Sequence, residues 1–237
     1  MKYEDSQRRI VEAYKRRADN QTDRVYQQFP AGTEYFRKAS ERDWLRLLDK
    51  FGFGGERLKE KKVYEVGCGA GGVLAWLLRW GAAPENLFGC DLLPERVAEA
   101  ARHLPAAVTI KACDAADTGA ETGGYDLVCQ STVFSSILSP EHRRAVALEM
   151  WRLASPGGWV VSYDMRYRNP ANPDVRPVLL AELAGYFPEA AECFARSVLL
   201  VPPLARRLAR WGGSPLCEFF SLFPFLRGHL MAAFRKP

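Results

Sequence analysis

The sequence predicts an α/β fold built around a mostly parallel β-sheet. Residues 62–66 form a short apolar run with an acid near its end, residues 67–72 contain four glycines, and residues 73–78 follow with helical spacing. This order indicates a strand, a tight turn and a helix. Repeated strand and helix patterns are typical of a parallel sheet with helices on both faces. Six more strands are expected, at residues 87–91, 108–114, 125–130, 159–164, about 193–201 and 229–235.

The glycine-rich turn predicts a nucleotide site. Glycines let the backbone turn sharply and keep side chains out of the space between the backbone and a ligand. In open α/β sheets, ligands bind at the carboxyl edge, where this turn lies. Gly67-x-Gly69-x-x-Gly72 also satisfies the dinucleotide fingerprint. However, Glu65 precedes it, and a carboxylate there repels a pyrophosphate and suits a cationic or amine-bearing ligand.

Residues 60–165 resemble the class I S-adenosylmethionine-dependent methyltransferases. The resemblance rests on an ordered set of motifs: E-x-G-x-G-x-G from Glu65 to Gly71, the strand-end Asp91, the later Asp114, D-L-V at 126–128 and P-G-G at 156–158. It implies a Rossmann-like sheet of seven strands, the last one antiparallel, with helices on both faces. It also implies S-adenosylmethionine as the cofactor.

The resemblance further implies the cofactor-binding residues. The residues expected at the methionine end and near the sulfonium are Glu65, Gly67, Cys68, Gly69, Gly71, Gln130 and Ser131. Asp91 is expected to accept hydrogen bonds from both ribose hydroxyls, because one carboxylate can accept two. Leu92 is expected to pack on the adenine, and Asp114, beside Ala115, to accept from its amino group. Alternatively, Asp91 and Asp114 cap the helices that follow them.

Composition favours one compact enzyme unit. A chain of 237 residues with 48% hydrophobic residues can bury a large core. The first residues contain no apolar signal region and no stretch has membrane-spanning length, so we expect a cytoplasmic protein without a transmembrane segment. The six cysteines lack C-x-x-C spacing and the three histidines are scattered, so no metal site is expected. Cysteines near the strand ends are expected to line the cofactor crevice as small apolar groups.

Positive charge is concentrated in the two terminal segments. Residues 1–62 contain 16 Lys and Arg against 11 Asp and Glu, a net of +5; residues 203–237 contain 6 against 1, also +5. The central residues 63–202 contain 11 against 16, a net of −5. Basic surfaces attract nucleic acid, anionic lipid or phosphorylated substrates, but they can also be solvated helix faces. No stable nucleic-acid partner is expected, and the oligomeric state is not predicted.

The N-terminal segment, residues 1–60, is expected to be a helical lid on a methyltransferase domain of residues 61–237. Ile10, Val11 and Tyr14 share one helix face, and residues 41–51 form a second amphipathic helix. By the resemblance, Tyr14 and Arg17 reach the carboxylate of the cofactor. The alternative is ordinary packing and solvent exposure.

Two segments are expected to select the acceptor. Residues 166–176 contain two Asn-Pro steps, which keep a loop out of helix and hold three arginines on a stiff support. The residues expected to contact the acceptor are Phe134, Arg166, Asn169 and Arg176. A structural loop is the alternative. The phenylalanine-rich residues 217–226 are interpreted as packing, an apolar acceptor pocket or a weak membrane-surface contact.

The favoured function is methyl transfer from S-adenosylmethionine to a small molecule, in natural-product or glycan biosynthesis. O-methylation of a glycosyl or secondary-metabolite hydroxyl is preferred, with Asp164 as the best-placed base. His142 is interpreted as a surface residue. The alternatives are N-methylation of a small amine, an RNA methyltransferase, and a non-catalytic partner subunit with the same fold.

Overall fold

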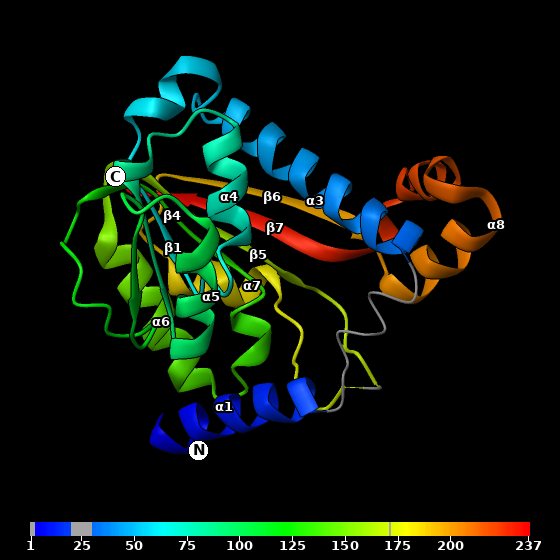
Figure 1. Cartoon of the computed structure of the whole chain (residues 1–237), viewed down its shortest axis with the longest axis horizontal. Coiled ribbons are helices and arrows are strands. Elements are labelled where there is room, and N and C mark those ends of the chain that lie inside the picture. The colour runs from blue at the N-terminus through cyan, green and yellow to red at the C-terminus, as the bar shows by residue number, and fades with distance from the viewer. Residues whose placement is uncertain (1–2, 20–29, 171) are drawn as a thin grey trace.

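A seven-stranded sheet runs through the centre of the molecule (Figure 1). The computed structural model describes residues 3–19, 30–170 and 172–237. The strand order is β3-β2-β1-β4-β5-β7-β6; β7 pairs antiparallel with β5 and β6, and the other pairs are parallel. This confirms the predicted sheet with its antiparallel last strand. The strands are β1 (Val63–Val66), β2 (Leu87–Asp91), β3 (Thr109–Ala112), β4 (Tyr125–Ser131), β5 (Ala154–Met165), β6 (Glu192–Leu200) and β7 (Arg227–Arg235).

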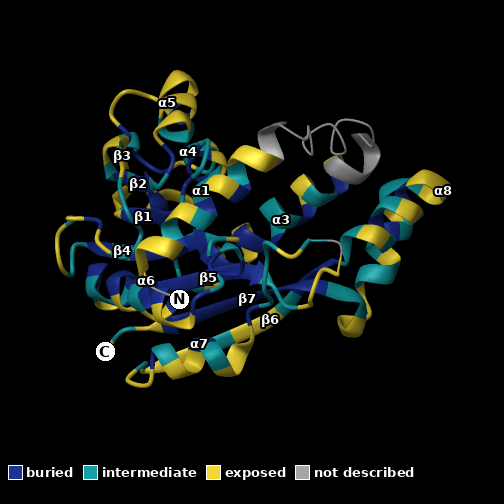
Figure 2. Cartoon of the chain, turned by 90° about the horizontal axis from the view of Figure 1, so that it is seen from below, coloured by how far each residue is buried: buried dark blue, intermediate teal, exposed yellow. Residues whose placement is uncertain are grey.

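Helices cover both faces of the sheet (Figures 1 and 2). The helices are α1 (Tyr3–Asp19), α3 (Pro30–Lys50), α4 (Gly72–Arg79), α5 (Pro94–His103), α6 (Pro140–Leu153), α7 (Leu180–Tyr186) and α8 (Pro202–Ser221). Side chains of α3, α4 and α5 share one buried cluster, and those of α1, α6 and the segment around α7 share another. Neighbouring strand residues alternate between the clusters, as Val63 and Tyr64 or Leu127 and Val128 do, because successive side chains point to opposite faces.

The long helix α3 belongs to the core, so fewer of residues 1–60 can form the expected lid. The helix predicted from residue 41 begins at Pro30, and Tyr35, Trp44 and Leu48 are each 1% exposed. Ser40 and Tyr163 hydroxyls lie 3.0 Å apart, which joins α3 to β5. Tyr35 and Ala39 pack against buried residues of β6 and α8. Among the described residues of this segment, only α1 therefore remains as a possible lid.

A buried arginine braces the carboxyl edge of the sheet. Arg143 on α6 is fully buried; its Nε donates to the carbonyl of Ile137 at 2.7 Å, and its Nη2 donates to that of Arg176 at 3.0 Å. Its Nη1 lies 3.0 Å from both carboxylate oxygens of Glu182 on α7. One side chain therefore joins the segments that follow β4 and β5.

Replacing Arg143 by alanine should destabilise the fold strongly. The change removes the donor to buried carbonyls and breaks the ion pair with Glu182, which keeps only its contacts with Arg176 and Tyr186 among the described residues; breaking a buried pair typically costs about 3–5 kcal/mol. Urea unfolding measures the loss. Arg144→Ala is the matched control, because the neighbouring side chain is exposed and its removal should change the unfolding free energy by about 0.5 kcal/mol or less. Equal losses in the two variants would contradict the bracing role.

Candidate active site

The turn between β1 and α4 depends on glycine at three positions. Gly67, Gly69 and Gly71 all have positive φ, between 53° and 81°, where other residues are strained. A Cβ on Gly67 would stand 2.3 Å from Val133 after β4, and one on Gly71 would stand 2.6 Å from Leu104 after α5. The turn is thus enclosed by neighbouring segments on two sides. Gly71 does not line the ligand-sized cavity described next, so we expect this glycine to allow close packing of the turn rather than to contact a ligand.

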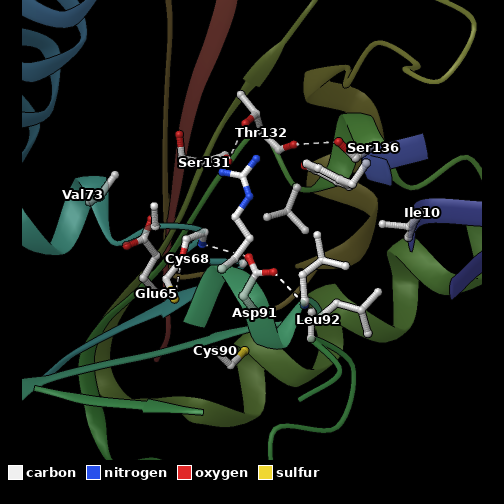
Figure 3. A pocket seen from close by; sticks show the side chains of 18 of the residues that line it. Ile10, Glu65, Cys68, Val73, Cys90, Asp91, Leu92, Ser131, Thr132 and Ser136 are labelled. Atoms are coloured by element: carbon white, nitrogen blue, oxygen red, sulfur yellow. Dashed lines mark hydrogen bonds between the residues drawn. The ribbon is translucent and has the colours of Figure 1, made fainter. Parts of the chain in front are cut away.

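A cavity of about 420 Å³ opens beside this turn. Figure 3 shows Glu65, Cys68 and Asp91 on one side of it, Ser131, Thr132 and Ser136 on the opposite side, and Ile10 of α1 approaching from a third. The walls therefore come from the ends of several strands and from α1. The expected cofactor residues that line the cavity are Tyr14, Glu65, Gly67, Cys68, Gly69, Asp91, Leu92, Asp114, Ala115 and Ser131.

Asp91 holds the glycine turn in place. Its Oδ2 accepts a hydrogen bond from the Gly69 N–H at 2.8 Å, and its Oδ1 accepts from the Leu93 N–H at 2.9 Å. Helix α5 begins after Leu93 without a side-chain cap, so helix capping does not explain Asp91. Each carboxylate oxygen retains a further lone pair for a ligand in the cavity.

Glu65 is a buried carboxylate with an unpartnered oxygen. It is 2% exposed, lines the cavity, and its Oε2 accepts no hydrogen bond from a described residue. Burial, with a smaller contribution from the negative charge of Asp91, raises the pKa of Glu65 well above its ordinary value. A donor or cation placed in the cavity would satisfy this oxygen and favour its ionised form.

Asp114 is the centre of a polar cluster that sequence reasoning did not find. Tyr3 and Gln7 of α1 both donate to its Oδ2, the Ala116 N–H donates to Oδ1 at 2.9 Å, and His142 Nε2 lies 3.6 Å from Oδ1. Burial alone would raise the Asp114 pKa, but the nearby His142 ring and the hydrogen bonds from Tyr3 and Ala116 outweigh it and lower the pKa to about 2.

The interpretation of His142 as a surface residue is wrong. Its side chain is 2% exposed, lines the cavity, and places Nδ1 2.9 Å from the Ser6 hydroxyl of α1. Ser139 caps α6 through the His142 N–H, so the first turn of that helix faces inward. The Ser-Pro start of the helix predicted its beginning but not the face that α1 covers.

Helix α1 covers the cavity between the two sides shown in Figure 3. Ile10 is 8% exposed, and the Tyr14 ring lies under the Arg96 guanidinium at 5.7 Å. Both Tyr14 and Arg96 line the cavity, so Arg96 is a further site residue that sequence reasoning missed. The side chain of Arg17 lies outside the described part of the chain.

Hydroxyl groups line the end of the cavity beside β4. Ser131, Thr132 and Ser136 all contribute to its wall, and the Ser136 hydroxyl donates to the Thr132 carbonyl at 3.2 Å. Thr132 has a φ of 62°, which is strained for a β-branched residue. Such strain persists only where the surroundings impose it, and it clusters at functional sites.

Three expected site residues lie behind this wall rather than on it. Phe134 is fully buried in the core. Gln130 Oε1 accepts from the Val133 N–H at 2.8 Å, and its Nε2 donates to the Ser162 hydroxyl at 2.6 Å. Asp164 is fully buried and accepts from the N–H groups of Ser135 at 3.1 Å and Met165 at 2.8 Å. Gln130 and Asp164 therefore support the turn that presents the hydroxyls, and Asp164 does not reach the cavity.

The loop after β5 connects α1 to the sheet. Asp174 accepts hydrogen bonds from Arg9 at 3.4 Å and Arg16 at 3.1 Å. Arg176 directs its side chain to Glu182 at 3.4 Å, so it is held by the protein. Arg166, half-buried, lies over the Tyr167 ring at 4.8 Å, and Asn169 is exposed.

The comparisons with known proteins agree with this geometry. Residues 63–158, which include the glycine turn, Asp91 and Asp114, match a family model described as a methyltransferase domain. The chain carries a class I S-adenosylmethionine-dependent methyltransferase domain. Its cofactor is S-adenosylmethionine, and it is an enzyme. No curated protein sequence gives a significant match.

Solved structures share the fold at low identity. A methyltransferase from Mesorhizobium loti has 20% identity and a TM-score of 0.57, covering 84% of this chain and 98% of that one. A 1,6-didemethyltoxoflavin N1-methyltransferase from Burkholderia thailandensis has 16% identity and a TM-score of 0.57, covering 94% and 89%. The [4+2]-cyclase SpnF has 18% identity and a TM-score of 0.54, covering 81% and 80%. The fold thus also occurs in a protein described as a cyclase.

The residues of the cavity fit this cofactor. Glu65 offers its unpartnered, buried oxygen to an ammonium group, which the methionine end of the cofactor carries. Asp91 offers the free lone pairs of a carboxylate to two ribose hydroxyls. Asp114 and Leu92 line the same cavity, and the resemblance implies the adenine beside them.

Replacing Asp91 by alanine should weaken S-adenosylmethionine binding by about 2–4 kcal/mol, because charge-assisted hydrogen bonds and the support of Gly69 are lost together. Calorimetric titration measures the change. Glu95→Ala is the matched control, since Glu95 is exposed in the first turn of α5 and lies outside the cavity. A wild-type protein that binds NADH but not S-adenosylmethionine would contradict the cofactor assignment.

Proposed function

We propose that this enzyme methylates a hydroxyl of a small secondary metabolite, and that the hydroxyl is an acidic one, of the phenol or enol type. The observation that carries the proposal is the composition of the cavity. Carboxylates line its cofactor side, whereas the polar side chains on the wall beside β4, which we call the acceptor side, are the neutral hydroxyls of Ser131, Thr132 and Ser136. A cavity of about 420 Å³ is within the range of small-molecule sites.

Access to the cavity supports a small acceptor. Helix α1 is attached at two places, to Asp114 through Tyr3 and Gln7 and to Asp174 through Arg9 and Arg16. A polymer such as RNA would need α1 to move away from the cavity. The basic N-terminal segment favoured the RNA alternative. Two of its arginines, Arg9 and Arg16, instead contact Asp174 within the chain.

The lack of a base on the acceptor side favours an acidic hydroxyl. Removing the proton of a sugar hydroxyl requires a general base within hydrogen-bond reach. The titratable residues that line the described cavity are Glu65, Asp91, Arg96, Asp114 and His142, together with Cys68, Cys90, Cys113 and Tyr14. The carboxylates and His142 belong to the cofactor side or to the α1 contact. A phenol or enol loses its proton readily, so it needs no such group.

When bound, the cofactor supplies an electrophilic methyl group on its sulfonium. The protein then contributes mainly by aligning the acceptor, since orientation alone lowers a bimolecular barrier substantially. The Ser131 hydroxyl can donate to an acceptor oxygen. The Thr132 and Ser136 hydroxyls donate to the carbonyls of Ser131 and Thr132, so each keeps lone pairs that can accept a hydrogen bond from the O–H of the acceptor. Asp164 acts through Ser135 and keeps their turn in position, so we infer that it is a positioning residue rather than a base.

N-methylation of a small amine is the second candidate, because a neutral amine also needs no base.

Mass spectrometry of an acceptor panel separates the possibilities by detecting the gain of one methyl group. Phenols and enols should react, and sugars with only aliphatic hydroxyls should not. Reaction of amines alone would favour N-methylation, and reaction of sugars or RNA would overturn the proposal.

Helix α1 should act as a lid over the bound cofactor. Hydrogen exchange of residues 3–16 should slow when S-adenosylmethionine is added, because the ligand adds contacts under the helix. Asp174→Ala should speed this exchange and weaken cofactor binding by about threefold to tenfold, although Asp174 does not line the cavity. Asp126→Ala is the matched control, since Asp126 forms an ion pair with Lys61 away from α1. Unchanged exchange with and without cofactor would contradict the lid.

Arg166 should bind a polar or anionic group of the acceptor. Arg166→Ala is expected to raise the KM for the acceptor about tenfold through the loss of one charge-assisted hydrogen bond, with cofactor affinity unchanged. Arg176→Ala serves as the comparison: its side chain contacts Glu182, so it should lower stability more than it changes KM. Steady-state kinetics and thermal unfolding of both variants test this, and unchanged KM in Arg166→Ala would make the loop structural.

A further inference from the structure

Helix α8 and the residues after it present large apolar side chains to solvent. Trp211 is 83% exposed, Phe225 69% and Leu222 66%. Phe223 lies 5.9 Å, between ring centroids, from both Phe219 and Phe225. We call Phe219, Leu222, Phe223 and Phe225 the apolar patch. Burial would remove much of this surface from water, so the patch favours contact with an apolar environment.

The first half of α8 combines arginine with tryptophan on one face. Gly213 interrupts the helix with a φ of 64°, so α8 consists of two helical pieces that meet at a kink. In the first piece Ala205 and Ala209 are buried, while Arg207, Arg210 and Trp211 are exposed at helical spacing on the other face. Tryptophan suits the boundary between lipid headgroups and acyl chains, and arginines beside it attract anionic headgroups.

An arginine-lined pocket borders the apolar patch through Leu222. Its volume is about 150 Å³, and four arginines and two acids line it, a net of two positive charges: Arg42, Arg46, Arg196, Arg227, Asp43 and Glu218. Arg42 pairs with Glu218 through two hydrogen bonds of 2.8 and 2.9 Å. Arg227 donates to the carbonyls of Ser221 at 2.7 Å and Ser197 at 3.1 Å; because carbonyls are neutral, these contacts do not cancel its positive charge.

We propose that α8, the apolar patch and the arginine pocket together form a docking surface for an anionic phospholipid bilayer. The arginines suit lipid phosphates, and Trp211 and the phenylalanines suit the boundary between headgroups and acyl chains. Charge argues against a second copy of this chain, because the same basic surface would face itself. Nucleic acid would use the arginines but would leave the apolar patch exposed.

This surface lies at the acceptor side of the molecule. Strand β6 runs parallel to β5, since both are antiparallel to β7, so α8 leaves the sheet at the same edge as the cavity. The Tyr167 hydroxyl donates to the Phe225 carbonyl at 3.2 Å, which joins the loop after β5 to the patch. Figure 1 shows α8 at the right-hand end of the molecule, away from α5 and α6. Within the described residues no helix is long and apolar enough to cross a membrane, so the contact is with the surface of the bilayer.

Vesicle flotation of the full chain without cofactor or acceptor tests the proposal independently of the proposed reaction. Vesicles of phosphatidylcholine alone are compared with vesicles of equal parts phosphatidylcholine and phosphatidylglycerol. The protein should float with the anionic vesicles, and the bound fraction should fall as salt rises. Equal binding to both vesicles, or binding to neither, overturns the proposal.

Surface variants locate the contact. Arg196→Glu and Arg207→Glu should each lower partitioning about fivefold or more, and Trp211→Ser with Phe225→Ser should lower it further. The matched controls are Arg102→Glu on α5 and Leu148→Ser on α6, both exposed elsewhere, which should bind nearly as the wild type does. Circular dichroism verifies folding. Wild-type binding by the α8 variants, or a dimer that only these variants dissociate, overturns the proposal.

Discussion

The site depends on a close approach between one glycine turn and the segments on either side of it. Val133 occupies the space that a side chain at Gly67 would need, and Leu104 occupies that of Gly71. Asp91 then fixes the middle of the turn through the Gly69 N–H. Because these three contacts come from different strand and helix ends, the backbone at the cavity wall is set by the packing of the whole sheet edge.

Helix α1 completes the cavity by covering polar groups that would otherwise face water. Tyr3, Ser6 and Gln7 meet Asp114 and His142 from above, while Ile10 contributes an apolar contact. The helix thus adds both hydrogen bonds and apolar surface to a site that the sheet alone leaves open. Its two attachments differ in chemistry: one is a set of hydrogen bonds to Asp114 and His142, and the other consists of the ion pairs of Arg9 and Arg16 with Asp174. Ion pairs of the second kind contribute little each, so that end of α1 is the easier one to release.

The strands, their order along the chain and most of the cofactor side could be predicted from the sequence, because they depend on local patterns. An acid at a strand end or a glycine in a turn has its neighbours within a few residues. His142, Arg96 and Thr132 could not be found in this way. Their place in the cavity depends on which helix face α1 covers and on a strained backbone angle, and neither leaves a local pattern. Asp164 was predicted to face the acceptor because it lies at a strand end, but its carboxylate is buried behind the cavity wall. The position of a residue at a strand end does not determine the direction of its side chain.

The packing of α3 has a consequence for the order in which the chain can fold. Arg42 of α3 pairs with Glu218 of α8, a separation of 176 residues along the chain. Tyr35 and Ala39 likewise pack with Leu200, Ala205 and Cys217. During synthesis from the N-terminus, this apolar face of α3 stays exposed until β6 and α8 have been made, near the end of the chain. Contacts between residues so far apart in the sequence slow folding, and the apolar surface that remains exposed in the meantime is prone to aggregation. The nascent chain is therefore the form of this protein most in need of a chaperone.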